Sequence, residues 1–97
     1  MGALAFLDDD PLFDGTCVRF VGDDGGDTVV CGVTTTALKY GDPALPHYGL
    51  VPAEAFISAY RKLMIQIHDA ARVKYEKKVL EAEGPVLVMI HRHDLVP

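Results

Sequence analysis

The chain has 97 residues, of which 49% are hydrophobic and 24% are charged. These are the proportions of an ordered globular protein, and the length predicts a single domain spanning residues 1–97. The formal net charge of −5 argues against nucleic-acid binding, because contacts to phosphate groups need a concentrated basic surface.

The first seven residues are apolar, but they lack the positive charge and the length of a secretory signal. Nowhere does the sequence approach the run of about 18 apolar residues that a membrane-spanning helix requires. We therefore expect a cytoplasmic protein that does not associate with a membrane. The apolar stretch at residues 3–7 predicts a short strand.

Residues 17–33 have the pattern of a β-hairpin. Apolar and polar residues alternate over residues 17–21, and residues 28–33 return as a partner strand. Between them, the segment Asp23–Gly26 supplies the glycines and aspartates that a hairpin loop needs.

The length of this loop predicts how the two strands pair. With a four-residue loop, Val18 opposes Cys31 and Phe20 opposes Val29, so that four apolar side chains share one face. Cys17 then points to the opposite face. A disulfide would require a one-residue slip that destroys this pattern, so we expect two reduced thiols.

A short helix is expected next. The threonines at positions 34–36 can cap its first turn, and Gly41 can end it. Residues 42–51 contain two prolines and a glycine, which predicts an irregular connection to the following helix.

A long amphipathic helix is expected from Pro52 to Glu83. Pro52 suits a first helical turn, and Gly84 followed by Pro85 should end the helix. At about 100° per residue, eight apolar side chains fall in one stripe that would face the core. They are Phe56, Tyr60, Leu63, Met64, Ile67, Ala71, Tyr75 and Val79.

Two kinds of residue depart from this stripe. Lys74 and Lys78 project near it, while Ile65, Val73 and Leu80 lie on other sides of the helix. One interpretation is that the lysine stems lie along the edge of the core and that the three aliphatic residues are ordinary surface residues. The other is that these three residues contact a second copy of the chain, since a second apolar flank needs cover.

The apolar run at residues 86–90 predicts a last strand in the interior of the sheet. The expected fold class is therefore α+β. We expect a small antiparallel sheet, made of the N-terminal hairpin and the C-terminal strand, packed on one long and one short helix.

The order of several short motifs resembles a small bacterial family catalogued as domain of unknown function 1488. The motifs span nearly the whole chain: Phe13-Asp14-Gly15, Val18-Arg19-Phe20, Val30-Cys31-Gly32-Val33, Thr36-Ala37-Leu38, Ala55-Phe56, Ala70-Ala71-Arg72, Lys74-Tyr75 and Asp94-Leu95. The resemblance implies a small α+β domain in a bacterial cytoplasm. It implies no activity, because the family has no established function.

His91 and His93 are the densest pair of candidate metal ligands. In an extended strand they would share one face, and His68 could in principle add a third ligand. However, a histidine pair beyond the last strand of a small domain is more often a solvated chain end, and the spacing fits neither a zincin nor a zinc ribbon. Cys31 has the properties of a small core residue rather than of a nucleophile. We therefore expect no bound cofactor.

Three functional hypotheses follow. The preferred one is a non-catalytic interaction or accessory module that forms a homodimer through Ile65, Val73 and Leu80 and has a further, unidentified protein partner. The second is a small metal- or thiol-dependent enzyme that uses the histidines or Cys31. The third is a weak nucleic-acid binder that uses the lysines between positions 74 and 78, although acidic side chains interleave with the basic ones.

Overall fold

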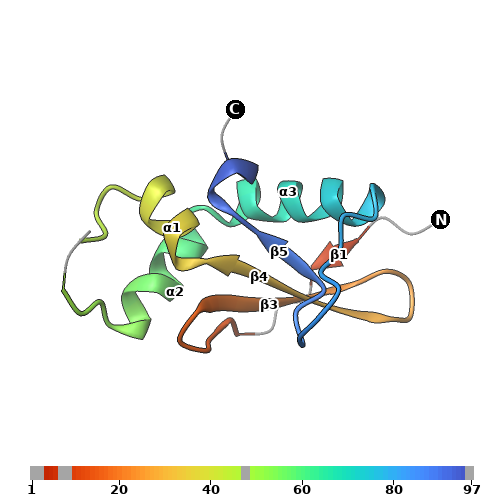
Figure 1. The fold of residues 1–97 in the computed structure, drawn as a ribbon, viewed down its shortest axis with the longest axis horizontal. Helices are drawn as coiled ribbons and strands as arrows, with labels where there is room; N and C mark the ends of the chain where they lie inside the picture. Colours follow the sequence, from red (N-terminus) through yellow and green to blue (C-terminus); the bar gives the residue numbers. More distant parts are fainter. Residues whose placement is uncertain (1–3, 7–9, 47–48, 96–97) are drawn as a thin grey trace.

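The computed structural model describes residues 4–6, 10–46 and 49–95 of the chain (Figure 1). In chain order, this part contains β1 (Ala5–Phe6), β2 (Leu12–Phe13), β3 (Cys17–Asp23), β4 (Thr28–Thr34), α1 (Thr35–Gly41), α2 (Ala53–Lys62), α3 (Met64–Glu76), β5 (Val88–Ile90) and the 3₁₀ helix η1 (Arg92–Asp94). The predicted α+β fold class is confirmed.

The sheet has the order β1-β3-β4-β5, and β2 also pairs with β3. Strands β1 and β2 are both antiparallel to β3 and pair with its opposite ends. The predicted C-terminal strand exists as β5, but it runs parallel to β4, so the expectation of a purely antiparallel sheet is wrong. A parallel neighbour requires a crossover connection, and α1, α2 and α3 provide it.

The hairpin of β3 and β4 is confirmed, but its register lies two residues from the expected one. Phe20 pairs with Cys31 rather than with Val29, and Val18 pairs with Val33 rather than with Cys31. A shift of two residues keeps every side chain on its original face. The predicted set of four apolar side chains therefore stays together in the core.

Strand β1 lies close against β3. Leu4, which is 1% exposed, packs on Gly22, where an added Cβ would stand 2.8 Å from Leu4 Cδ1. A glycine in β3 thus makes room for the start of the chain. The strand predicted for residues 3–7 is observed at Ala5–Phe6, while Ala3 and Leu7 lie outside the described residues.

The predicted short helix is confirmed as α1. The Thr34 hydroxyl oxygen accepts a hydrogen bond from the Ala37 N–H at 3.1 Å, which satisfies one of the free donors of the first turn. The helix ends at Gly41, as expected.

The single helix expected up to Glu83 is wrong, because this segment forms two shorter helices. Helix α2 ends before Leu63, whose backbone angles (φ −100°, ψ 9°) leave the helical range, and α3 ends at Glu76. Lys78 then adopts a left-handed φ of 58°. The chain leaves the helix well before Gly84, so residues 77–87 are a connection to β5.

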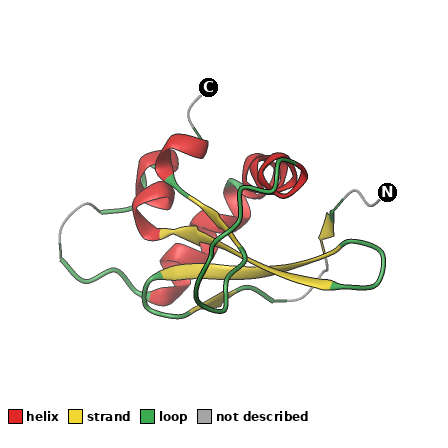
Figure 2. Cartoon of the chain, turned by 45° about the vertical axis from the view of Figure 1, so that its right-hand side comes forward, coloured by secondary structure: helices red, strands yellow, loops and turns green. Residues whose placement is uncertain are grey.

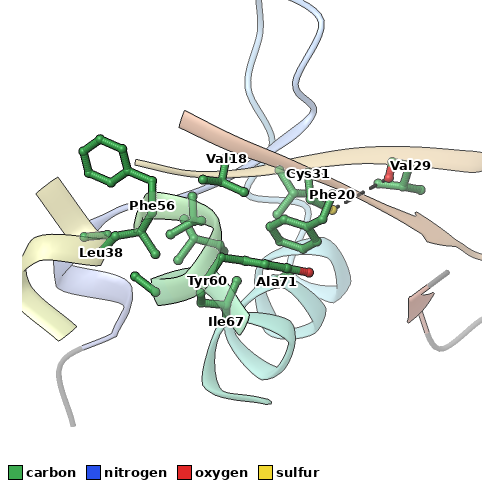
Figure 3. Packing of buried hydrophobic residues seen from close by; sticks show 14 of the residues in the cluster. Val18, Phe20, Val29, Cys31, Leu38, Phe56, Tyr60, Ile67 and Ala71 are labelled. Atoms are coloured by element: carbon green, nitrogen blue, oxygen red, sulfur yellow. Dashed lines mark hydrogen bonds between the residues drawn. The ribbon is translucent and has the colours of Figure 1, made fainter. Parts of the chain in front are cut away.

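The apolar stripe is confirmed in its central part. Phe56, Tyr60, Ile67 and Ala71 are all buried, and they point toward the strand residues of the core (Figure 3). Leu63 and Tyr75 are partly buried and pack against the same cluster.

Two members of the stripe were assigned wrongly. Met64 is 39% exposed, because the break at Leu63 makes it the first residue of α3. Val79 is 51% exposed, because it lies beyond the end of α3.

The core is one hydrophobic cluster between the sheet and the three helices. Helix α3 lies lengthwise beside the strands in Figure 1 and is seen nearly end-on in Figure 2. Its members from the strands include Val18, Phe20, Val33, Val88 and Ile90. In the part of the chain that the structure describes, no helix has the length and apolarity needed to cross a membrane.

Candidate functional site

Exposed aliphatic side chains lie on the side of α3 that faces away from the sheet. Ile65 is 76% exposed and Val73 is 48% exposed. At about 100° per residue they stand about 80° apart around the helix, with Asp69 midway between them. Leu80 is 38% exposed, but it lies beyond the end of α3. The prediction that Leu80 lies on the same helix as Ile65 and Val73 is therefore wrong. We call Ile65, Asp69 and Val73 the outer face of α3.

The outer face carries an ion pair at its centre. Arg72 Nη1 lies 3.0 Å from Asp69 Oδ1, one helical turn away. The two side chains are 41% and 66% exposed, so solvent screens the pair and it contributes little to stability.

Lys74 lies on the other side of α3, where it joins three elements. Its Nζ donates to the Met89 carbonyl oxygen at 2.8 Å and to Asp94 Oδ2 at 3.0 Å. The same carboxylate oxygen accepts the His91 N–H at 2.8 Å. The side chains of Lys74 and Asp94 are only 12% and 16% exposed. The pair thus fastens α3 to β5 and η1.

The environment of Asp94 favours its charged form. Burial acts to raise the pKa of the carboxyl group, but the hydrogen bond from the His91 N–H and the ammonium group of Lys74 outweigh it. The pKa of Asp94 is therefore held below its ordinary value. Lys74 is paired with Asp94, and Lys78 lies beyond the end of α3. The lysines between positions 74 and 78 therefore do not form one basic patch on a helix.

His68 lies in an aromatic cluster that holds β1 against α3. Its ring stacks on Phe6 with centroids 3.9 Å apart and an interplanar angle of 13°, and its Nε2 is 2.8 Å from the Tyr60 hydroxyl oxygen. Arg72 adds two contacts, a hydrogen bond from Nε to the Leu4 carbonyl oxygen at 3.0 Å and a guanidinium group 5.0 Å from the centroid of the Phe6 ring.

Burial is the main reason that the pKa of His68 falls to about 4 from 6.5, and the positive charge of Arg72 lowers it further against the opposing effect of Asp69. The folded state therefore resists a protonation that the unfolded chain accepts. The contribution of neutral His68 to stability is complete above pH 6.5 and is lost as the pH falls from 6.5 to about 4. We expect the free energy of unfolding, measured with urea, to decrease across this window.

Replacing His68 by glutamine should remove most of this pH dependence. His93, whose side chain is 78% exposed, provides the matched control, and His93→Gln should keep the slope of the parent protein. Equal slopes in the parent and in His68→Gln would contradict the assignment.

The structure does not bring the three candidate metal ligands together. The rings of His91 and His93 stack with centroids 5.6 Å apart, while His68 lies in the aromatic cluster with Phe6 and Tyr60. Over residues 4–6, 10–46 and 49–95, no three His, Cys, Asp or Glu side chains are placed so that they could hold a metal ion.

The two cysteines are free and buried, on opposite faces of the hairpin. Burial raises the pKa of Cys31 to about 12. Burial also raises the pKa of Cys17, and the nearby carboxylate of Asp14 adds to the effect. Both environments disfavour the thiolate, which is the nucleophilic form of the side chain.

Comparison with known proteins identifies a similar fold but indicates no activity. No protein-family model matches the chain, and no curated protein matches it. Among solved structures, the fold is similar to that of a protein of unknown function from the DUF1488 family of Shewanella loihica, with a TM-score of 0.72 and 15% sequence identity. The match covers 94% of this chain and 92% of that one. The resemblance to domain of unknown function 1488 is thereby confirmed at the level of the fold.

Proposed function

We propose that the protein is a non-catalytic interaction module that self-associates as a dimer through the outer face of α3. The observation that carries this proposal is the 76% exposure of Ile65, a large aliphatic side chain on a helix. Asp69 follows one helical turn later, and the exposed Val73 follows two turns later. Covering these side chains removes apolar surface from water.

The outer face is self-complementary. Ile65 and Val73 are equally spaced on either side of Asp69, so a two-fold axis at Asp69 would place Ile65 of one copy opposite the partner's Val73 in an antiparallel helix pair. The two Asp69 carboxylates would approach each other at the axis. Each has Arg72 at 3.0 Å in its own copy, which offsets their repulsion.

A binding role is favoured over a catalytic one by the state of the reactive groups. Cys31 has a pKa raised to about 12 by burial, and His68 stacks on Phe6 with its Nε2 bonded to Tyr60. These side chains support the packing of the domain. A cytoplasmic location is supported by the two free cysteines, which suit a reducing compartment.

The dimer should be weak, because two aliphatic residues per copy cover much less area than a standard stable interface. We expect a dissociation constant on the order of 100 μM, which corresponds to about −5.5 kcal/mol. The mass measured by size-exclusion chromatography with light scattering should therefore rise with protein concentration.

Ile65→Asp should keep the protein monomeric over the same concentration series, because a carboxylate would face an apolar contact. Leu50, a fully exposed aliphatic residue outside α3, gives the matched control, and Leu50→Asp should dimerise like the parent. A parent protein that stays monomeric at millimolar concentration would rule the proposal out.

A further inference from the structure

Two adjoining hollows open on the surface beside α1, and they share Tyr40. The first, of about 410 Å³, is lined by Tyr40, Gly41, Leu63, Gln66 and Leu95. The second, of about 200 Å³, is lined by Thr36, Lys39, Tyr40 and Arg92. We call the two together the Tyr40 groove. At one end Leu63 and Leu95 supply apolar surface beside the polar Gln66. At the other end Lys39 and Arg92 make the groove basic.

The basic end holds two cations that no carboxylate neutralises. Within the described residues, neither Lys39 nor Arg92 lies within ion-pair distance of an Asp or Glu side chain. The Arg92 guanidinium group lies 5.0 Å from the centroid of the Tyr40 ring, and this cation–π contact orients it. In a chain of net charge −5, two converging unneutralised cations favour an anionic ligand group.

The end of the groove that Leu63 and Leu95 line is preformed. An added Cβ at Gly41 would stand 2.7 Å from Leu63 Cδ1, so the Leu63 side chain packs directly on the backbone at the end of α1. On the other side of the groove, Arg92 is the first residue of η1 and Leu95 follows its end. The Lys74–Asp94 pair fastens η1 to α3. Binding here would cost little ordering of the protein.

We propose that the Tyr40 groove binds a short extended peptide segment of another protein in which an acidic residue lies next to an apolar one. The carboxylate would bind Lys39 and Arg92, and the apolar side chain would lie on Leu63 and Leu95. The shape favours a peptide over a small molecule, because both hollows are open to solvent, whereas small-molecule sites enclose most of their ligand. This goes beyond self-association, because the binding residues lie off the outer face of α3.

The probe is a blocked pentapeptide, acetyl-Asp-Asp-Leu-Leu-Ala-amide, titrated into the ¹⁵N-labelled full chain at low salt. We expect amide shift changes gathered at residues 36–41, 63–66 and 92–95. The double variant Lys39→Glu/Arg92→Glu should weaken binding at least about tenfold, since two attractions become repulsions. Lys77→Glu, which reverses an exposed charge outside the groove, should leave the affinity within about twofold of the parent value.

Three results would overturn the proposal. They are equal binding of the peptide with both acids replaced by Asn, shift changes scattered over the whole surface, and equal changes caused by inorganic phosphate at the same concentration, which would indicate a simple anion site. Repeating the titration with Ile65→Asp separates this proposal from dimerisation. Binding should persist in that monomeric variant, and its loss there alone would assign the effect to the dimer.

Discussion

Replacing Ile67 by alanine should lower the free energy of unfolding by about 3–4 kcal/mol, which is a large share of the roughly 5–15 kcal/mol that stabilises a domain of this size. Ile67 is completely buried between α3 and the sheet. The substitution removes three methyl or methylene carbons from a closely packed region and leaves a cavity that the rigid neighbours cannot fill.

The helix offers an unusually close control, because Ile65 has the same side chain two residues away and is 76% exposed. Ile65→Ala should change the free energy of unfolding by less than about 0.5 kcal/mol. Both values come from urea denaturation at a protein concentration low enough to keep the chain monomeric. Similar losses for the two variants would mean that α3 does not present Ile67 to the core.

The second large effect is expected at the pair formed by Lys74 and Asp94. Lys74→Ala should destabilise the fold by about 2–4 kcal/mol, because it leaves a nearly buried carboxylate without its cation and frees the Met89 carbonyl oxygen. Lys77→Ala, three residues along the chain and exposed, should cost less than about 0.5 kcal/mol.

A double-mutant cycle with Asp94→Ala measures the pair itself. The loss in the double variant should be smaller than the sum of the single losses by about 1–3 kcal/mol, since either substitution alone breaks the same interaction. The pKa of Asp94 lies below its ordinary value of 3.8, so this stabilisation is complete above pH 3.8 and is lost as the pH falls below it. Strict additivity would show that the two residues act independently.

The sequence predicts those parts of the fold that depend on short-range pattern. Alternation in β3 and β4 identifies the buried face of the hairpin, but it cannot distinguish registers that differ by two residues, because both place the same side chains inward. The hydroxyl cap and terminal glycine predict α1 correctly for the same reason, since each signal lies within a few residues of the feature it controls.

The failures concern features that are set by distant contacts. No glycine or proline marks the break at Leu63, and the apolar stripe continues through it, so periodicity alone predicts one helix. The end of α3 at Glu76 is followed by a left-handed lysine rather than a glycine. The direction of β5 is equally hidden, because an apolar run of strand length fits a parallel and an antiparallel neighbour alike.

The candidate site shows the same division. The exposure of Ile65 and Val73 follows from helical periodicity and is predicted correctly. The partners of Lys74 and His68 are not, because Asp94 and Tyr60 reach them through tertiary packing. The Tyr40 groove escaped prediction too, since Lys39 and Arg92 meet only when η1 folds back beside α1.

The parallel pairing of β5 with β4 also has a consequence for how the chain is made. Val88 pairs with Cys31, and all three helices lie between these residues in the sequence. During synthesis, β4 therefore has an open apolar edge until residue 90 has emerged from the ribosome. A nascent chain, or one truncated before β5, has that edge free to pair with another chain, so we expect it to aggregate more readily than the chain that includes β5.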